Sequence, residues 1–230
     1  MKNKFFSLGS ILSLTLSFHL MAQTQEESRS LGVFNEIKIS NSIEAELVKG
    51  DSHSIEISAS GLDLDRVETD ISNRSLEVSV SGTNFGGSSV KVKITYVEID
   101  ELTANTSSKI YVKDILDAKM VKINASTASY VEAEVNCQSL ELSAATNSKI
   151  FIDGTARNLD LKAFTNSEIN GENLQTEVAQ VRVNTAAQAR FGVSESIKGS
   201  AATAGKVYYE GDPNIVDVRT NTGGEIERDL

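Results

Sequence analysis

Few residues in this chain are of the types that usually carry out chemistry in proteins. The chain has 230 residues, two histidines and one cysteine, and His53 is the only histidine that follows residue 19. It stands in a turn, Gly50 to His53, where we expect it to be solvated. Cys137 is remote from His53 in the sequence and is expected to be a small buried apolar residue. These residues predict no catalytic site and no cofactor-binding site, because a nucleophile needs a base beside it.

Carboxylates are the candidates for binding a cation or for acid–base chemistry. Glu141 and Asp160 hold the same position in successive units of a repeat, so their backbones should lie about 4.8 Å apart if the units stack. Such a pair could bind calcium weakly, or serve a polysaccharide-active hydrolase or lyase. Lys122 holds the same position one unit earlier, which favours an ordinary ladder of alternating charge. We therefore predict no metal site and no enzyme.

The repeat is the strongest pattern in the sequence. A threonine marks each unit at Thr106, Thr127, Thr146, Thr165, Thr185, Thr203 and Thr222. Residues at even distances from the marker are small or apolar, and those at odd distances are mostly polar, which predicts strands. A unit this short buries its apolar face only by stacking on its neighbours. The sequence thus predicts an all-β fold, a right-handed parallel β-helix or solenoid of about seven coils over residues 99–230.

Of the residues before the repeat, only 32–98 are predicted to form one structural domain with the solenoid. Residues 1–22 contain Lys2 and Lys4, an apolar run and Ala22, which is the layout of a signal peptide. Residues 23–31 are expected to be a flexible lead. Residues 32–98 contain alternating strands and predict either a β-rich N-terminal cap or the first, irregular coils. The protein is thus expected to be exported, to the periplasm, the cell surface or the medium.

Charge and hydropathy predict that the protein has no nucleic-acid partner and no membrane span. The formal charge of −10 becomes −12 when residues 1–22, with two lysines and no acid, are removed. Such a surface repels the phosphates of nucleic acids, so we expect no nucleic-acid partner. After residue 22 no segment is long and apolar enough to span a membrane.

A candidate binding face emerges from the outward positions of the repeat. Three coils place an aromatic residue five positions after the marker and a lysine three positions after it. The residues are Lys109, Tyr111, Lys149, Phe151, Lys206 and Tyr208. Exposed aromatic rings beside polar groups can stack on sugars or anchor a protein partner. The competing interpretation is an ordinary strand surface, on which aromatics are common.

The chain also resembles a known family. The segment GVFNEIKISNSIEAELVKGD at residues 32–51, with Phe34 and Ile37, is similar to the opening of the head GIN domain proteins. Tyr209, Gly211 and Pro213 match the family's closing motif. The family's glycine-rich corner is mostly Thr-x-Ser here. The resemblance covers roughly residues 30–228. It implies a β-helical fold and an adhesin-like role, as in secreted proteins of Bacteroidetes-type bacteria. It implies no catalytic residues in this chain.

The sequence therefore predicts a secreted, non-enzymatic, adhesin-like protein that presents a repetitive surface to a glycan or protein at the cell envelope. Two alternatives stay open. One is a polysaccharide-active β-helix hydrolase or lyase. The other is a structural spacer or assembly unit that self-associates through the ends of the solenoid, where unpaired strand edges invite pairing.

Overall fold

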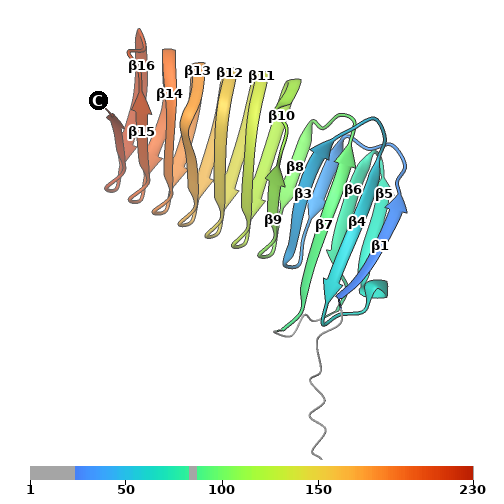
Figure 1. Ribbon diagram of the computed structural model, residues 1–230. Coiled ribbons are helices and arrows are strands. Elements are labelled where there is room, and N and C mark those ends of the chain that lie inside the picture. The colour runs from blue at the N-terminus through green and yellow to red at the C-terminus, as the bar shows by residue number, and fades with distance from the viewer. Residues whose placement is uncertain (1–23, 83–86, 230) are drawn as a thin grey trace, which may run out of the picture.

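The computed structural model describes residues 24–82 and 87–229, and the predicted signal peptide lies outside them. Figure 1 shows an elongated stack of strands in two facing layers. The first strands are β1 (Thr24–Ser30), β2 (Glu36–Ile39), β3 (Ile43–Lys49), β4 (Ser54–Ser60), β5 (Val67–Ser72), β6 (Ser75–Val80) and β7 (Ser89–Tyr96), with a single 3₁₀ turn, η1 (Leu64–Arg66). They are followed by β8 (Glu101–Ala104), β9 (Lys109–Val112), β10 (Leu116–Ser126), β11 (Tyr130–Ala145), β12 (Lys149–Phe164), β13 (Glu168–Asn184), β14 (Gln188–Ala202), β15 (Lys206–Glu210), β16 (Ile215–Asn221) and β17 (Glu225–Arg228). The described residues contain no α-helix, so the all-β prediction is confirmed.

Parallel pairing of successive repeats confirms the solenoid of about seven coils. Each long strand bends in its middle, so that one arm lies in each layer. In β11, residues 130–137 pair with the first arm of β12, and residues 139–145 pair with its second arm, one repeat further on. Leu142 stands beside Leu161 and Ala144 beside Ala163, so like residues form ladders. The handedness of the coil stays a prediction.

The two layers are here named the front sheet and the back sheet. The order in the front sheet is β1, β4, β7, β3, β9, the first arms of β11 to β14, β15 and β17. The order in the back sheet is β5, β6, β2, β8, β10, the second arms of β11 to β14, and β16. Residues at even distances from the marker fill the space between the sheets.

The marker threonine starts a two-residue turn in every coil. Thr146 and Asn147 have φ of 54° and 59°, and the other six markers and their following residues also have positive φ. Two consecutive residues at positive φ reverse the chain, so each turn leads from a strand in the back sheet to the next strand in the front sheet. Asn41 and Ser42 form the same turn between β2 and β3, with φ of 63° and 64°. The repeat thus begins one coil earlier than the threonine markers indicate, because asparagine stands in place of threonine.

The first coils do not stack in chain order. The β2–β3 coil pairs on one side with β6 and β7, which follow it in sequence, and on the other side with β8 and β9. Beyond β6 and β7, three strands add in antiparallel fashion: β5 in the back sheet, and β4 followed by β1 in the front sheet. That these strands protect the end of the solenoid stays a prediction.

The expected flexible lead is instead a strand over most of its length. Residues 24–30 form β1, which pairs with β4 along its whole length, from Thr24 beside Ser60 to Ser30 beside Ser54. The sequence QTQEESRSL shows no apolar alternation because β1 lies at the outer edge of the sheet, where six of its seven residues are exposed. The pairing of β1 with β4 comes from backbone hydrogen bonds, and these do not depend on the pattern of side chains in the sequence.

The small inward residue after each turn has a structural role. Ser108, Ser129, Ser148 and Ser167 are at most 2% exposed. Each hydroxyl donates a hydrogen bond to a carbonyl of the preceding coil, such as that from Ser148 to the Ala125 oxygen at 2.8 Å. A buried hydroxyl needs such a partner, and each of these serines finds it in the preceding coil.

Candidate binding face

The predicted aromatic residues lie on the outer surface of the front sheet. Tyr111 of β9 and Phe151 of β12 stand on either side of Glu132 in one row across the strands. Lys109 and Lys149 stand on either side of Tyr130 in the neighbouring row. The parallel, in-register pairing brings these positions together because each coil repeats the same path.

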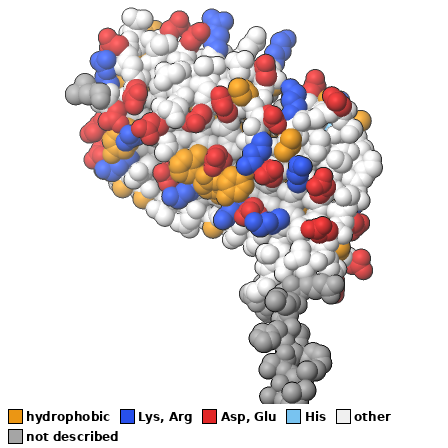
Figure 2. Space-filling view, viewed as in Figure 1, with side chains coloured by type: hydrophobic (Ala, Val, Ile, Leu, Met, Phe, Trp, Pro, Cys, Tyr) orange, Lys and Arg blue, Asp and Glu red, His pale blue; other side chains and the backbone are white. Residues whose placement is uncertain are grey.

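Tyr130, which was not among the predicted residues, completes a continuous aromatic patch. Its ring centroid lies 5.5 Å from that of Tyr111 and 5.4 Å from that of Phe151. All three side chains are partly exposed. We name Tyr111, Tyr130 and Phe151 the aromatic patch. Figure 2 shows an apolar area on this face with acidic and basic side chains around it.

The chemistry of Tyr130 is set by its neighbours. Its hydroxyl donates a hydrogen bond of 2.7 Å to the Glu132 carboxylate. Burial, followed by this hydrogen bond, raises the pKa of Tyr130 above its ordinary value, so the hydroxyl stays protonated. The signal for Tyr130 was present in the sequence, since it holds the position three after its marker that Lys109, Lys149 and Lys206 hold in other coils.

The predicted face divides into two parts. Tyr208 lies three coils beyond Phe151 in the row, after Asn170 and Arg190. The Arg190 guanidinium lies 5.5 Å from the centre of the Tyr208 ring. Lys206 pairs with Glu225 at 2.8 Å, and this bond raises the pKa of Lys206. The six predicted residues therefore share one face. Tyr111 and Phe151 belong to the aromatic patch and Lys109 and Lys149 adjoin it, whereas Lys206 and Tyr208 lie apart from it.

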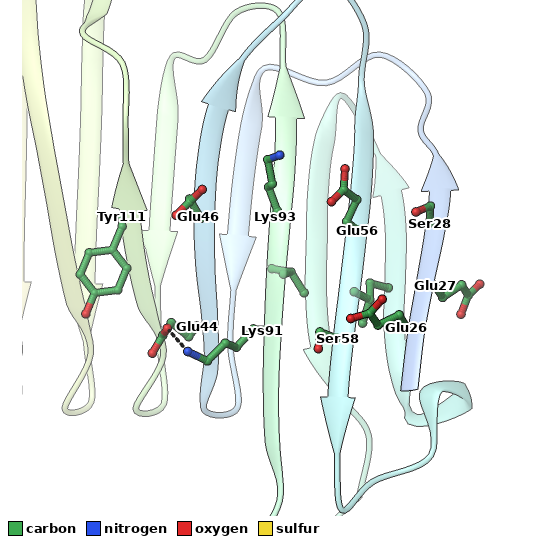
Figure 3. A pocket seen from close by; sticks show the side chains of 12 residues that line it. Glu26, Glu27, Ser28, Glu44, Glu46, Glu56, Ser58, Lys91, Lys93 and Tyr111 are labelled. Atoms are coloured by element: carbon green, nitrogen blue, oxygen red, sulfur yellow. Dashed lines mark ion pairs between the residues drawn. The ribbon is translucent and has the colours of Figure 1, made fainter. Parts of the chain in front are cut away.

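A depression lies beside the aromatic patch, towards the N-terminal strands. It has a volume of about 480 Å³ and is lined by Glu26, Glu27 and Ser28 of β1, Glu56, Ile57 and Ser58 of β4, Lys91, Val92 and Lys93 of β7, Glu44 and Glu46 of β3, and Tyr111 of β9. These strands are adjacent in the front sheet, and Figure 3 shows the side chains on them. Tyr111 belongs to both the depression and the aromatic patch, so the two are continuous.

Most positive charges around the depression are already paired. Lys91 binds Glu44 at 2.9 Å, which raises the pKa of Lys91. Lys113 lies 3.5 Å from Glu46, and its ammonium lies 5.9 Å from the centre of the Tyr111 ring. Within the described ranges, neither Lys93 nor Glu56 has an ion-pair partner, although the two stand side by side on β7 and β4. The depression therefore offers both a free ammonium and a free carboxylate.

The predicted carboxylate pair lies on the back sheet, away from the aromatic patch. Glu141 and Asp160 are adjacent in register on the back sheet, as predicted, but Asp160 accepts a hydrogen bond of 2.9 Å from Lys162. Lys122 stands beside Glu141 and pairs with Glu101 at 2.8 Å. The predicted charge ladder is present. No group of three or more His, Cys, Asp or Glu side chains suited to a metal ion occurs in the described part of the chain.

The remaining histidine and cysteine are both partly buried. The ring of His53 lies 4.3 Å from that of Phe34, so the expectation of a solvated turn histidine is wrong. Burial, and then the charge of Arg74, lower the pKa of His53. Cys137 packs beside the core but is not fully buried, and desolvation raises the pKa of its thiol to about 11. Neither side chain faces the depression.

Solved structures of other bacterial proteins share this fold. A "putative adhesin" from Bacteroides fragilis matches with a TM-score of 0.80 at 15% identity, over 91% of this chain and 98% of that one. A "putative adhesin" from Parabacteroides merdae matches with a TM-score of 0.74 at 18% identity, over 90% and 97%. A "putative lipid binding protein" from Parabacteroides distasonis matches with a TM-score of 0.67 at 16% identity, over 90% and 97%.

The family comparison covers most of the chain. Residues 33–213 match a family described as "Putative auto-transporter adhesin, head GIN domain". No curated protein matches the chain. Among the residues that the structure describes, no helix is long and apolar enough to cross a membrane.

Proposed function

This chain belongs to the head GIN domain family, and we propose that it is an exported, non-enzymatic adhesin-like protein that binds a glycan or protein partner at the cell envelope. The observation that supports this proposal is the aromatic patch. Three partly exposed rings in mutual contact, beside Lys109 and Lys149, offer apolar area with polar groups around it. Sugars and protein hot spots are recognised by surfaces of this kind.

The family and its solved relatives support the binding role. Two of these relatives, from Bacteroides fragilis and Parabacteroides merdae, are each described as a "putative adhesin". The relative from Parabacteroides distasonis is described as a "putative lipid binding protein". A flat strand surface with charged rows suits a soluble polar ligand better than an acyl chain, which needs an enclosed apolar cavity.

The test is binding of residues 23–230 to a broad glycan array. We expect the double variant Tyr111→Ala with Phe151→Ala to lower binding at least tenfold, because it removes the two ends of the aromatic patch. Phe164→Ala is the matched control, since Phe164 is a partly exposed phenylalanine on the back sheet. Tyr208→Ala reports whether the distant part of the face contributes. Circular dichroism checks that each variant keeps its β spectrum.

Two results would contradict the proposal. If the double variant binds as well as the parent, the aromatic patch is not the binding surface. If incubation with polysaccharides releases new reducing or unsaturated ends, the protein is an enzyme. Loss of binding only in the double variant would support the proposed function.

A further inference from the structure

We infer that the depression and the aromatic patch form one extended site for an uncharged linear glycan that lies along the solenoid axis. This inference rests on the proposed function, because it names the ligand class and its direction for the same face. The starting point is the continuity of the two surfaces through Tyr111, which lines the depression and contacts Tyr130.

The register of the front sheet sets the direction of the site. One row of outward side chains crosses the strands in the order Glu56, Lys93, Glu46, Tyr111, Glu132 and Phe151. Neighbouring strands lie about 4.8 Å apart, so the row advances by about that distance at each residue. This step is close to the length of one sugar ring in an extended β-linked chain. A linear glycan along the axis would therefore meet the same kind of contact at each successive sugar.

The second row supports the same direction. It runs through Ser58, Lys91, Glu44, Lys109, Tyr130 and Lys149. The two rows are two residues apart along each strand, which is about 7 Å, and together they flank a strip that is wide enough for one sugar ring. Figure 3 shows polar side chains of both rows pointing outwards over the depression.

Charge on this face favours an uncharged ligand. Lys91, Lys113 and Lys149 are paired with Glu44, Glu46 and Glu168, so their charges are largely compensated. Of the side chains that line the depression, Glu26, Glu27, Glu44, Glu46 and Glu56 are acidic and only Lys91 and Lys93 are basic. An anionic polysaccharide would meet this excess of negative charge and be repelled. The hydroxyls of a neutral sugar can donate to Glu56 and accept from Lys93.

The depression and the aromatic patch have different roles in this site. The aromatic patch supplies apolar contact for the hydrophobic faces of two or three sugars. The depression supplies convergent donors and acceptors, which fix orientation in a ligand site. A short oligosaccharide occupies only one of the two, and a longer one occupies both. Affinity should therefore rise with chain length.

The experiment measures binding by titration calorimetry with neutral β-1,4-linked oligomers of glucose, mannose and N-acetylglucosamine, each of two and six units. An oligogalacturonate of six units is the anionic comparison. We expect at least one neutral six-unit chain to bind ten times more tightly than its two-unit chain, and more tightly than the oligogalacturonate. Glu56→Ala with Lys93→Ala should reduce this gain to less than threefold. Both side chains are exposed and unpaired, so this variant should fold.

Each outcome separates the inference from the proposed function. Binding that is lost in the Tyr111 and Phe151 double variant, but is the same for two and six units, overturns the extended site and leaves the proposed function standing. Tighter binding of the oligogalacturonate overturns the uncharged ligand class. No binding to any array glycan or oligomer overturns the inference and, with it, the glycan form of the proposed function. A length gain that the Glu56 and Lys93 variant retains overturns the role of the depression.

Discussion

At the scale of single residues, backbone contact between coils decides which side chains the solenoid accepts. Gly154 lies in β12 with φ of 107°, and a Cβ atom there would meet the backbone oxygen of Val135 in the preceding coil. Gly199 has φ of 140° and a Cβ atom there would meet the Val181 oxygen in the same way. Gly211, which belongs to the family's closing motif, has φ of 112° and faces the Val193 oxygen. The motif glycine is therefore explained by close stacking of coils.

The first prediction at this scale concerns Gly154. Gly154→Ala should destabilise the protein by roughly 2–4 kcal/mol, because it adds both backbone strain and a clash with the neighbouring coil. The matched control is Gly223→Ala, since Gly223 has φ of 73° but no atom within 4 Å of the added Cβ. Strain alone predicts a loss of roughly 1–2 kcal/mol for the control. Urea unfolding measures both, and equal losses would show that the contact with Val135 adds nothing.

The candidate binding face shows which single residues a repeated sequence pattern can indicate. Lys109, Tyr111, Lys149 and Phe151 were indicated because their positions in the repeat are the same from coil to coil. Tyr130 was missed because it interrupts a row of lysines and so looks like an exception in that row. The depression could not be predicted, since Glu56 and Lys93 become neighbours only through the antiparallel pairing of β4 with β7.

At the scale of elements, the stacked two-residue turns are the most regular feature of the fold. The amide of Asn147 donates to the Thr165 oxygen of the next coil at 3.0 Å, and the amide of Ala128 donates to the Thr146 oxygen at 2.9 Å. These bonds connect turn to turn along one edge of the solenoid. The left-handed conformation suits asparagine or glycine better than threonine, because a β-branched side chain is strained at positive φ.

The turns therefore carry a prediction about stability. Thr146→Asn should raise stability by roughly 1 kcal/mol, because it relieves strain at φ of 54° without removing a backbone hydrogen bond. Ala128→Thr, which adds a β-branched residue at φ of 60°, should lower stability by a similar amount. Thermal unfolding followed by circular dichroism measures both changes. A loss of stability in Thr146→Asn would mean that contacts between successive threonines outweigh the strain.

Sequence patterns predicted the repeated elements well and the first elements poorly, for a physical reason. From β8 onwards each coil follows the one before it, so the period in the sequence is also the period in space. Before β8, the β2–β3 coil lies between elements that both follow it in the chain. The turn of that coil was not predicted because Asn41 stands in place of the marker threonine. The strand β1 was not predicted because its exposed edge position gives no apolar alternation. Periodicity reports stacking only where stacking and chain order agree.

At the scale of the whole molecule, the solenoid makes a long face from a short repeat. Each coil contacts only its two neighbours, so stability is close to a sum of local terms. The N-terminal half adds β1, β4 and β5 to the sheets, and the described strands at the other end, β16 and β17, pair on one side only. Ile215 and Val216 in β16 are 52% and 51% exposed. We therefore expect stability to fall along the molecule from β9 to β17.

Hydrogen exchange can measure this gradient with two matched substitutions. Val131 in β11 and Val207 in β15 are the same residue type and are both 0% exposed, but Val131 lies between paired coils and Val207 lies near the last pair. Each change to alanine removes buried apolar contacts at a cost of roughly 2 kcal/mol. Val207→Ala should speed amide exchange in β15 to β17 and leave β9 to β12 unchanged, because the end coils open without the rest.

Val131→Ala should instead speed amide exchange in the coils on both sides of β11, since β11 pairs with a coil on each side and opening there disrupts both pairings. The aromatic patch lies on these central coils, so Val131→Ala should also weaken the proposed glycan binding, whereas Val207→Ala should not. If both variants speed exchange equally at every strand, the solenoid unfolds as a single cooperative unit. In that case the binding face would have no stability advantage from its central position, and the two variants should bind glycan alike.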